Sequence, residues 1–484
     1  MNRKIYFLFL AGIVALSSCK KDYLDKNPYN SIPLLTSINT ETDMVTVLNG
    51  VYGGLRATDL YGRTLMVKGD LMADNTFVTT NNSGRYLSMN NYVFISTDAY
   101  AGGIWSNAYS VIKNANNVIN ANVTASANVN QYKGEAYAIR ALLLFELVRN
   151  FATPYTIDST KDGIPIVTTF DFTTLPARNK VKEVYAQVIK DLETAYGLLT
   201  LYRGSAYFSK FAARALEARV YQNMGAWTSA KTVAQDVVTN SGWNMLPATQ
   251  YTLPSGSPST GNYSPGGYWS NPVVQTSTKV ETMFEVASDL LNNNGFDQLG
   301  FIYLTIGGGY GDILVTPDLY NQYAATDSRR ALIPTGTRSG QAGTAYLNYK
   351  YSNPANGADK DDTKILRISD IILILAEADY NTGDIPNAQL YLNKVAQQRD
   401  PTFTGYTSVA PQLLEDILNE RRKELAFEGS RFWDLLRLGR SWTKVKNQNP
   451  SSTLPITPTN TYLLLPIPQS EKDANPNMVQ NPGY

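Results

Sequence analysis

The sequence predicts a mostly α-helical protein, in which helix pairs of tetratricopeptide-like spacing form a scaffold and a loop-rich insert with short strands interrupts it. Apolar residues recur every three or four positions in successive stretches between residues 42 and 238 and again between 365 and 438, as in amphipathic helices. Two helix pairs repeat a pattern of small residues at their turns. Residues 247–356 lack helical periodicity and are rich in Gly, Ser, Pro, Asn, Thr and Tyr, so we expect a separate layer of loops there.

Eight helices are predicted ahead of the C-terminal segment. In the first, Val45, Leu48 and Tyr52 fall on one face of the helix. The stretch 69–100 that follows it is rich in Asn, Thr, Tyr and Asp, which favour turns. The predicted helices span residues 42–55, 105–119, 131–151, 179–199, 210–224, 227–238, 365–380 and 385–398.

The repeated pattern of small residues links the pair 210–224 and 227–238 to the pair 365–380 and 385–398. Ala218 and Ala376 are each followed by a glycine seven residues later and by an alanine five residues after that. Small residues let paired helices approach closely, and glycine closes a tight turn. This spacing is tetratricopeptide-like, although the two pairs lie far apart in the chain.

The segment 412–440 is predicted to form two consecutive helices. Apolar residues at helical spacing from Leu413 to Leu425 make one face of the first helix, which we expect to end at Gly429. Ser430 is the expected N-cap of a second, shorter helix that ends at Gly439.

The same segment carries a run of charges with two possible roles. Glu420, Arg421, Glu424 and Arg431 could form a catalytic cluster, or they could form an ion-pair network at the seam between the two helices. Charges beside an apolar face are normally paired when they are buried. The sequence therefore favours the ion-pair network.

The composition excludes several classes of activity. The chain has no histidine, which rules out Ser-His-Asp and Cys-His catalysis and any His-ligated metal site. Its only cysteine is Cys19, so no intramolecular disulfide can form. The formal net charge of +1 argues against nucleic acid as the main partner, and we expect no cofactor and no metal.

The N-terminus is predicted to be a secretory signal followed by a lipid-anchored tether. Residues 1–18 combine the basic Arg3 and Lys4 with an apolar run that is too short for a bilayer, which needs roughly 20 residues. The sequence Leu-Ser-Ser before Cys19 resembles a bacterial lipobox, in which the cysteine is lipidated; the alternative is an ordinary signal peptide with an incidental cysteine. Residues 19–30 would form the tether. No later segment is apolar enough to span a membrane.

Three parts of the chain carry a resemblance to a known family. The segment from Glu420 to Gly439 (ERRKELAFEGSRFWDLLRLG) resembles the C-terminal signature of the SusD/RagB family of Bacteroidetes nutrient-binding lipoproteins. The lipobox with the opening at 20–28, and the terminal stretches 463–468 and 475–484, are similar to those of the family as well. In that family the C-terminal signature is structural.

The resemblance implies a single domain over residues 31–484. Its helical scaffold would comprise residues 31–246 and 357–484, and its ligand-binding insert residues 247–356. The protein would be a non-enzymatic lipoprotein on the surface of the outer membrane. It would capture an oligosaccharide, or less often a peptide, and deliver it to a SusC-like TonB-dependent transporter.

Two stretches offer the side chains that glycan binding requires. Sugar rings stack on flat aromatic faces, and their hydroxyls pair with amides, carboxylates and arginines; the chain holds 32 tyrosines. The resemblance places ligand contacts in an early loop and in the insert, although each aromatic could instead pack the loops onto the helices. The candidates are Asp74, Asn75, Arg85, Tyr86 and Asn91 in the early loop, and Tyr268, Trp269, Phe296, Tyr303 and Tyr310 in the insert.

Two other function classes and one ion site stay open at this point. A glycoside hydrolase needs two carboxylates and no histidine, although no pair stands out by its spacing. A helical-repeat scaffold that binds only protein would predict an insert poor in aromatic residues.

Asp359, Asp361 and Asp362 could hold calcium, but an exposed acidic turn is the simpler interpretation. The glycines of 307–311 lack the spacing of a nucleotide-binding loop and predict a turn.

Overall fold

The computed structural model describes most of the chain beyond the N-terminal segment. The described residues are 38–171, 173–253, 255, 266–269, 276–289, 291–352, 362–446 and 449–484. The predicted signal, Cys19 and the tether lie outside them, as do Asp359 and Asp361. Among the described residues, no helix has the length and apolar character needed to cross a membrane.

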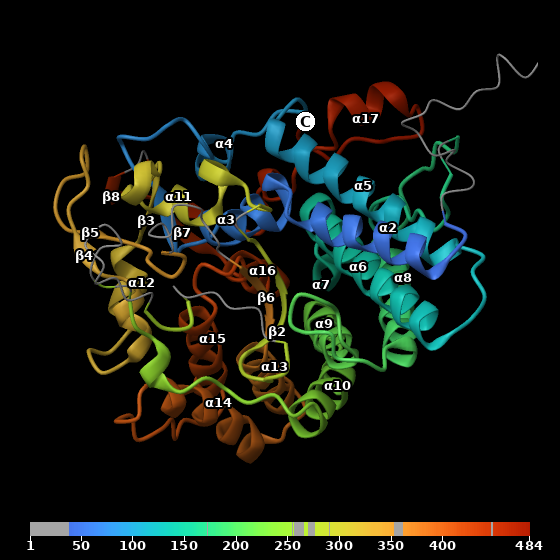
Figure 1. Cartoon of the computed structure of the whole chain (residues 1–484). Helices are drawn as coiled ribbons and strands as arrows, with labels where there is room; N and C mark the ends of the chain where they lie inside the picture. The colour runs from blue at the N-terminus through green and yellow to red at the C-terminus, as the bar shows by residue number, and fades with distance from the viewer. Residues whose placement is uncertain are drawn as a thin grey trace, which may run out of the picture.

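Helices dominate the fold, as predicted (Figure 1). They are α2 (Glu41–Leu55), α3 (Thr64–Leu71), α4 (Leu87–Asn91), α5 (Ala99–Asn120), α6 (Ala127–Phe151), α7 (Tyr155–Asp158), α8 (Val181–Leu198), α9 (Lys210–Met224), α10 (Trp227–Asn240), α11 (Leu299–Tyr303), α12 (Pro317–Asn321), α13 (Ile368–Asn381), α14 (Ile385–Arg399), α15 (Gln412–Glu424), α16 (Arg431–Arg437) and α17 (Gln469–Ala474).

The scaffold is a continuous series of helices. Each helix in the order α2, α5, α6, α8, α9, α10, α13, α14 contacts the next one, so the two predicted pairs belong to a longer tetratricopeptide-like array (Figure 1). Gly225 and Gly383 close the turns of these pairs with φ of +68° and +84°, a conformation that residues with a Cβ rarely adopt. The predicted role of both glycines is therefore confirmed.

Short strands pair the insert with the early loop and with the segment before α13, and two further strands pair with each other near the C-terminus. They are β1 (Thr76–Val78), β2 (Thr282–Val286), β3 (Ile313–Val315), β4 (Thr335–Gly336), β5 (Ala345–Tyr346), β6 (Thr363–Arg367), β7 (Trp442–Lys446) and β8 (Asn449–Ile456). All pairings are antiparallel, in the orders β1-β3-β5-β4, β2-β6 and β7-β8. The first sheet joins the early loop to the insert, which lies on one side of the scaffold in Figure 1 (yellow).

Two predicted elements differ in type from those observed. The helix predicted over 365–380 begins only at Ile368, because the residues before it form β6 and bond to β2. The predicted extended run 301–306 is instead the helix α11 followed by a turn at 306–308. Short apolar runs fit either a strand or a buried helix, and only the presence of a pairing partner decides between them. The turn predicted for the glycines of 307–311 is confirmed.

The C-terminal segment also ends its first helix earlier than predicted. Helix α15 ends at Glu424, and Phe427 then takes a left-handed φ of +67°. The backbone N–H groups of Phe427 and Gly429 donate to the buried carboxylate of Asp70 at 3.0 and 2.8 Å. The expected cap is wrong as well, since the Ser430 side chain makes no capping hydrogen bond to α16. A tertiary contact with α3 thus replaces the local stop signals.

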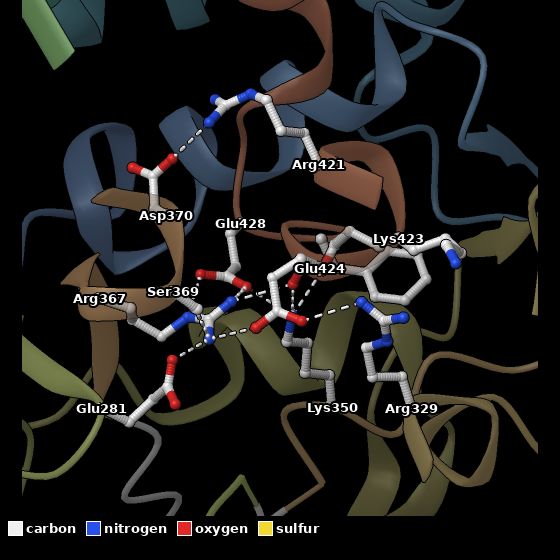
Figure 2. Close-up of polar contacts among 12 residues, drawn as sticks. Glu281, Arg329, Lys350, Arg367, Ser369, Asp370, Arg421, Lys423, Glu424 and Glu428 are labelled. Atoms are coloured by element: carbon white, nitrogen blue, oxygen red, sulfur yellow. Dashed lines mark hydrogen bonds and ion pairs between the residues drawn. The ribbon is translucent and has the colours of Figure 1, made fainter. Parts of the chain in front are cut away.

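A buried ion network joins the insert to the scaffold (Figure 2). Glu424, at the end of α15, contacts the guanidinium groups of Arg329, Arg367 and Arg399 at 3.0, 2.9 and 2.9 Å. Glu281, which precedes β2, pairs with the last two at 2.7 and 3.0 Å. Burial alone would raise the pKa of Glu424, but the three guanidinium groups around it hold that pKa well below its usual range.

The predicted cluster in the C-terminal segment is therefore an ion-pair network. Glu420 pairs with Arg329 at 2.7 Å, and Arg421 pairs with Asp370 at 2.9 Å. Glu420 and Arg421 are almost fully buried, at 0% and 3% exposure, so neither can meet a substrate in solution. Each of these charges is buried beside a partner of opposite charge, so a structural role accounts for them and no catalytic role is needed.

Candidate functional site

The β1–β3 pairing brings the two predicted binding stretches together. Phe77 lies opposite Leu314, and the Thr79 N–H donates to the Asp312 carbonyl at 2.7 Å beyond the end of the ladder. The Asp312 carboxylate then accepts the Ser83 N–H at 3.0 Å and also bonds the Ser83 hydroxyl. These bonds attach the early loop to the insert at a defined position.

Arg85, in the attached loop, stacks on Tyr310 of the insert. Its guanidinium carbon lies 3.7 Å from the Tyr310 ring centroid, and its Nη2 donates to the Tyr310 hydroxyl at 2.9 Å. Nη1 donates to the Ser83 hydroxyl at 2.9 Å. The Arg85 side chain is 30% exposed, so the stacked pair is held on the protein side and remains open to solvent.

Tyr86 anchors the backbone that displays Arg85. It adopts a left-handed φ of +60°, which costs a non-glycine residue about 1–3 kcal/mol. The surrounding contacts compensate: its ring stacks on Tyr100 at 4.6 Å, and Arg63 Nε donates to its hydroxyl at 2.8 Å. Burial raises the pKa of Tyr86 to about 12, so the phenol stays neutral. Tyr86 thus positions the loop and is not itself available to a ligand.

Phe296 and Asp297 complete the exposed cluster. Phe296 is 59% exposed, and its ring rests on Phe301 at 5.3 Å. Asp297 Oδ1 accepts from Arg63 Nη1 at 2.7 Å and lies 3.9 Å from Arg85 Nη2, with half of its side chain open to water. We call Arg85, Phe296, Asp297 and Tyr310 the Arg85–Tyr310 surface.

The chemistry of the Arg85–Tyr310 surface suits a polyhydroxylated ligand. The rings of Phe296 and Tyr310 offer apolar area, the guanidinium of Arg85 offers donors, and Asp297 offers an acceptor. Charge-assisted hydrogen bonds of this kind are stronger than neutral ones. No cluster of His, Cys, Asp and Glu that could hold a metal ion occurs in the described part of the chain.

Four of the ten predicted contact residues are instead structural, and for these the prediction of a ligand contact is wrong. Asn75, Tyr86, Trp269 and Tyr303 are at most 2% exposed. Trp269 packs under the ammonium of Lys350 at 4.1 Å, beside the buried ion network. An indole or phenol with no open face cannot stack on a sugar, so these rings belong to the core.

Asp74 is committed to an ion pair, and two further candidates remain predictions. The Asp74 carboxylate accepts from Arg431 Nε and Nη2 at 2.8 and 2.9 Å, which pairs the early loop with α16 and contradicts its role as a ligand contact. Tyr268 is half-buried, with its hydroxyl bonded to Thr282. Asn91 is exposed and accepts from Asn90 Nδ2 at 2.9 Å, without a bond to the Arg85–Tyr310 surface.

Several residues that organise the site escaped the sequence analysis. Arg63 bridges Tyr86 and Asp297, Asp312 fixes Ser83, and Arg338 Nη2 donates to the Tyr310 carbonyl at 2.5 Å. Each lies far along the chain from at least one of its partners. Only Asp297 had a local signal, since it follows the predicted Phe296 directly.

Two family models match the chain. Residues 22–222 match the model described as "Starch-binding associating with outer membrane", and residues 333–484 match the SusD family model. The two segments together cover more than two thirds of the sequence. The chain belongs to the SusD family. The predicted resemblance is thereby confirmed.

SusD-like relatives are similar to this chain over almost its whole length. SusD-like protein P2 of Formosa agariphila is 27% identical, with 100% of both chains covered. The crystal structure of a putative sugar binding protein from Bacteroides vulgatus is 29% identical with a TM-score of 0.80, covering 93% of this chain and 100% of that one. A SusD superfamily protein from Bacteroides thetaiotaomicron is 28% identical with a TM-score of 0.79, at 92% and 100% coverage.

The SusD family models leave out the part of the chain that carries most of the Arg85–Tyr310 surface. Residues 223–332 lie between the two matched segments, and they include Phe296, Asp297 and Tyr310. Arg85 belongs to the first matched segment. The surface therefore combines one residue from a segment that the family models describe with three residues from outside them.

Proposed function

We propose that this SusD-family protein is a non-catalytic lipoprotein of the outer-membrane surface. In this proposal it captures an oligosaccharide at the Arg85–Tyr310 surface and delivers it to a SusC-like TonB-dependent transporter. The observation that carries the proposal is the stacked Arg85 and Tyr310 pair, which lies 3.9 Å from Asp297, the neighbour in sequence of the exposed Phe296. The sugar-binding and starch-binding descriptions of the relatives support the ligand class.

Binding would combine stacking with directed hydrogen bonds. The apolar face of a sugar ring would lie against Phe296, while hydroxyls would meet Arg85 and Asp297. Arg85 is already held by Ser83 and Tyr310, so little side-chain entropy would be lost on binding. The surface would bind without hydrolysis, because a hydrolase needs a second carboxylate placed across the scissile bond, and among the four described residues of this surface only Asp297 carries a carboxylate.

Replacing Arg85 by alanine should weaken oligosaccharide binding at least tenfold, about 1.4 kcal/mol, without lowering the melting temperature. The variant removes the donors and leaves Tyr310 unsupported, while the anchor at Tyr86 remains. The measurement is isothermal titration calorimetry of a polysaccharide, oligosaccharide and peptide panel on the chain from residue 20. Chromatography of the same mixtures reports any hydrolysis.

Arg330→Ala is the matched control. Arg330 also stacks on a tyrosine, with its guanidinium carbon 4.6 Å from the Tyr320 ring and its Nε 3.1 Å from the Tyr320 hydroxyl. Equal losses in both variants would show that an Arg–Tyr stack supports the insert in general, and would overturn the assignment of the surface. Binding of peptides alone would select the peptide-binding alternative, and release of shorter sugars would select the hydrolase.

Replacing Cys19 by alanine should abolish lipid attachment and release the protein from the membrane. Acyl chains contribute about 0.8 kcal/mol of membrane affinity per buried methylene, and no other anchor is predicted. Labelling with a palmitate analogue and membrane fractionation check this result, with Ser18→Ala as the control. Membrane retention of the Cys19 variant would contradict the anchor.

The wild type should co-purify with a TonB-dependent transporter from solubilised outer membranes.

A further inference from the structure

A cavity of 340 Å³ lies between the C-terminal half of α2, the loop that precedes α9 and the end of β2. Its walls include Tyr52, Gly53, Arg56, Tyr207 and Glu285, none of which belongs to the Arg85–Tyr310 surface. Ligand pockets in proteins span roughly 300–1,000 Å³. The cavity is therefore large enough for a ligand of one or two sugar rings.

Gly53 keeps the wall formed by α2 open. A Cβ at this position would meet no atom within 4 Å, whereas a Cβ at the next residue, Gly54, would lie 2.5 Å from Val111 Cγ2. Glycine inside a helix is less favourable than alanine by about 1 kcal/mol. Close packing against α5 explains Gly54, but no packing contact explains Gly53. The missing side chain at Gly53 instead leaves room inside the cavity.

Arg56 presents unused donors to the cavity. Its Nε donates to the Ala287 carbonyl at 2.9 Å, and its own carbonyl accepts from Asn294 Nδ2 at 2.8 Å, so its backbone and stem are fixed. Among the described residues, its Nη1 and Nη2 make no hydrogen bond and no close ion pair, although the guanidinium attracts the carboxylates of Asp289 and Asp362 from a longer distance. A planar guanidinium group of this kind can bind a carboxylate through two parallel hydrogen bonds.

The wall formed by the loop before α9 carries a supported aromatic ring, that of Tyr207. The guanidinium of Arg203 lies 4.1 Å from the Tyr207 ring centroid, and Tyr52 meets that ring edge-on at 5.1 Å. The Tyr52 hydroxyl donates to Glu135 at 2.9 Å and accepts the Phe208 N–H at 2.9 Å, which locks its position. These contacts hold two phenol rings rigidly at the cavity, as stacking against a sugar ring requires.

Glu285 supplies a polar group that does not repel an anion at mildly acidic pH. It is 2% exposed and bonds the Ser205 hydroxyl, with Lys364 Nζ at 3.8 Å. Burial, and also the nearby carboxylate of Asp362, raise the pKa of Glu285 to about 7, against the opposing effect of Lys364. Below that pH its carboxyl is mostly neutral and can bond to a hydroxyl of the ligand.

We propose that this cavity is a second binding site, which takes a small acidic sugar. The carboxylate of a hexuronic acid would pair with Arg56, and its ring would lie against Tyr207 in the space left by Gly53. This site is separate from the Arg85–Tyr310 surface and goes beyond the proposed capture of an oligosaccharide. It would give the protein a preference for ligands that carry a uronic acid.

The test compares D-galacturonic acid and digalacturonic acid with D-galactose on the chain from residue 20, by ligand-observed NMR and calorimetry at pH 6. The wild type should bind the acids at least tenfold more tightly than galactose. Gly53→Phe should fill the cavity and abolish this binding. Gly50→Phe is the matched control, because Gly50 lies one turn earlier in α2, is exposed and also has free space around its Cβ position. Arg56→Gln should remove the preference for the acids.

Two results would overturn the proposal. The first is the absence of uronic acid binding to the wild type at millimolar concentration. The second is binding that survives Gly53→Phe. If that surviving binding is lost in Arg85→Ala, the acids bind at the Arg85–Tyr310 surface and the proposed function is left intact. Both helix variants replace glycine by a residue with higher helix propensity, so melting temperatures at or above that of the wild type exclude unfolding as the cause.

Discussion

Replacing Glu424 by glutamine should lower the free energy of unfolding by about 3–5 kcal/mol. Glutamine keeps the shape of the side chain but removes the charge that balances Arg329, Arg367 and Arg399. Three buried guanidinium groups would then share the remaining carboxylates, and uncompensated buried charge is strongly destabilising. Urea unfolding followed by circular dichroism measures the change, which should also appear as a drop in melting temperature.

The matched control for this variant is Glu415→Gln on the same helix. Glu415 pairs with Arg440 at 2.5 Å, but its side chain is 44% exposed, and exposed pairs of this kind contribute about 0–1 kcal/mol. A similar loss in both variants would contradict the special role of the buried ion network. Because the pKa of Glu424 is held low, the stability that this carboxylate contributes is present above about pH 4.5 and is lost on further acidification.

Replacing Lys68 by methionine should raise the free energy of unfolding at pH 7, by an amount on the order of 4 kcal/mol. Lys68 is fully buried, and among the described residues its Nζ has no hydrogen-bond partner. The ammonium instead lies 4.4 and 4.5 Å from the Phe432 and Trp433 rings. Burial, and then the nearby Arg149, lower the pKa of Lys68 to about 7, against the attraction of Glu146. Methionine fills the same space without this penalty.

The pH dependence provides an independent measurement of the same effect. In the unfolded chain a lysine has a pKa near 10.4, so between about pH 7 and pH 10 the unfolded state binds more protons than the folded state. Stability therefore rises with pH in this window, by up to about 1.4 kcal/mol per unit for each such lysine. Lys68→Met should remove part of this slope. Lys444 contributes to the slope that remains, because burial lowers its pKa to about 7 as well.

Lys394→Met is the control for the methionine substitution, because Lys394 is exposed on α14. It should change neither the stability at pH 7 nor the slope. If Lys68→Met is less stable and the dependence of stability on pH is unchanged, the prediction that the Lys68 amine is partly neutral is wrong. The fold would then require the positive charge of Lys68.

The helices could be predicted because their signals are local. The bounds predicted for α9 are the observed ones, and those of α2 and α14 differ by a single residue at one end. Amphipathic spacing and turn glycines act within one or two turns, where neighbours in sequence are also neighbours in space. The wrong predictions concern elements whose ends depend on contacts between residues far apart in the sequence. Helix α15 stops at Glu424 because Asp70, more than 350 residues earlier, bonds the chain that follows it.

The candidate site could be predicted as two stretches but not residue by residue. Composition identified an early loop and an insert rich in aromatic and amide side chains, and the β1–β3 pairing does bring them together. Tyr310 and Trp269 looked alike in the sequence, since each lies among glycines and other turn-forming residues. The fold places Tyr310 under Arg85 at the surface and Trp269 under Lys350 in the core.

The sequence by itself determined the helical scaffold, the absence of histidine chemistry and the family to which the chain belongs, and the anchor at Cys19 stays a prediction from the sequence. Periodicity, composition and short motifs are properties of the chain, so they can be read without coordinates. Only the tertiary structure decided which charges are buried as pairs, which rings face water, and that Arg56 and Gly53 border an open cavity. Burial and pairing depend on contacts between distant segments, and the energies of both follow from the environment that those contacts create.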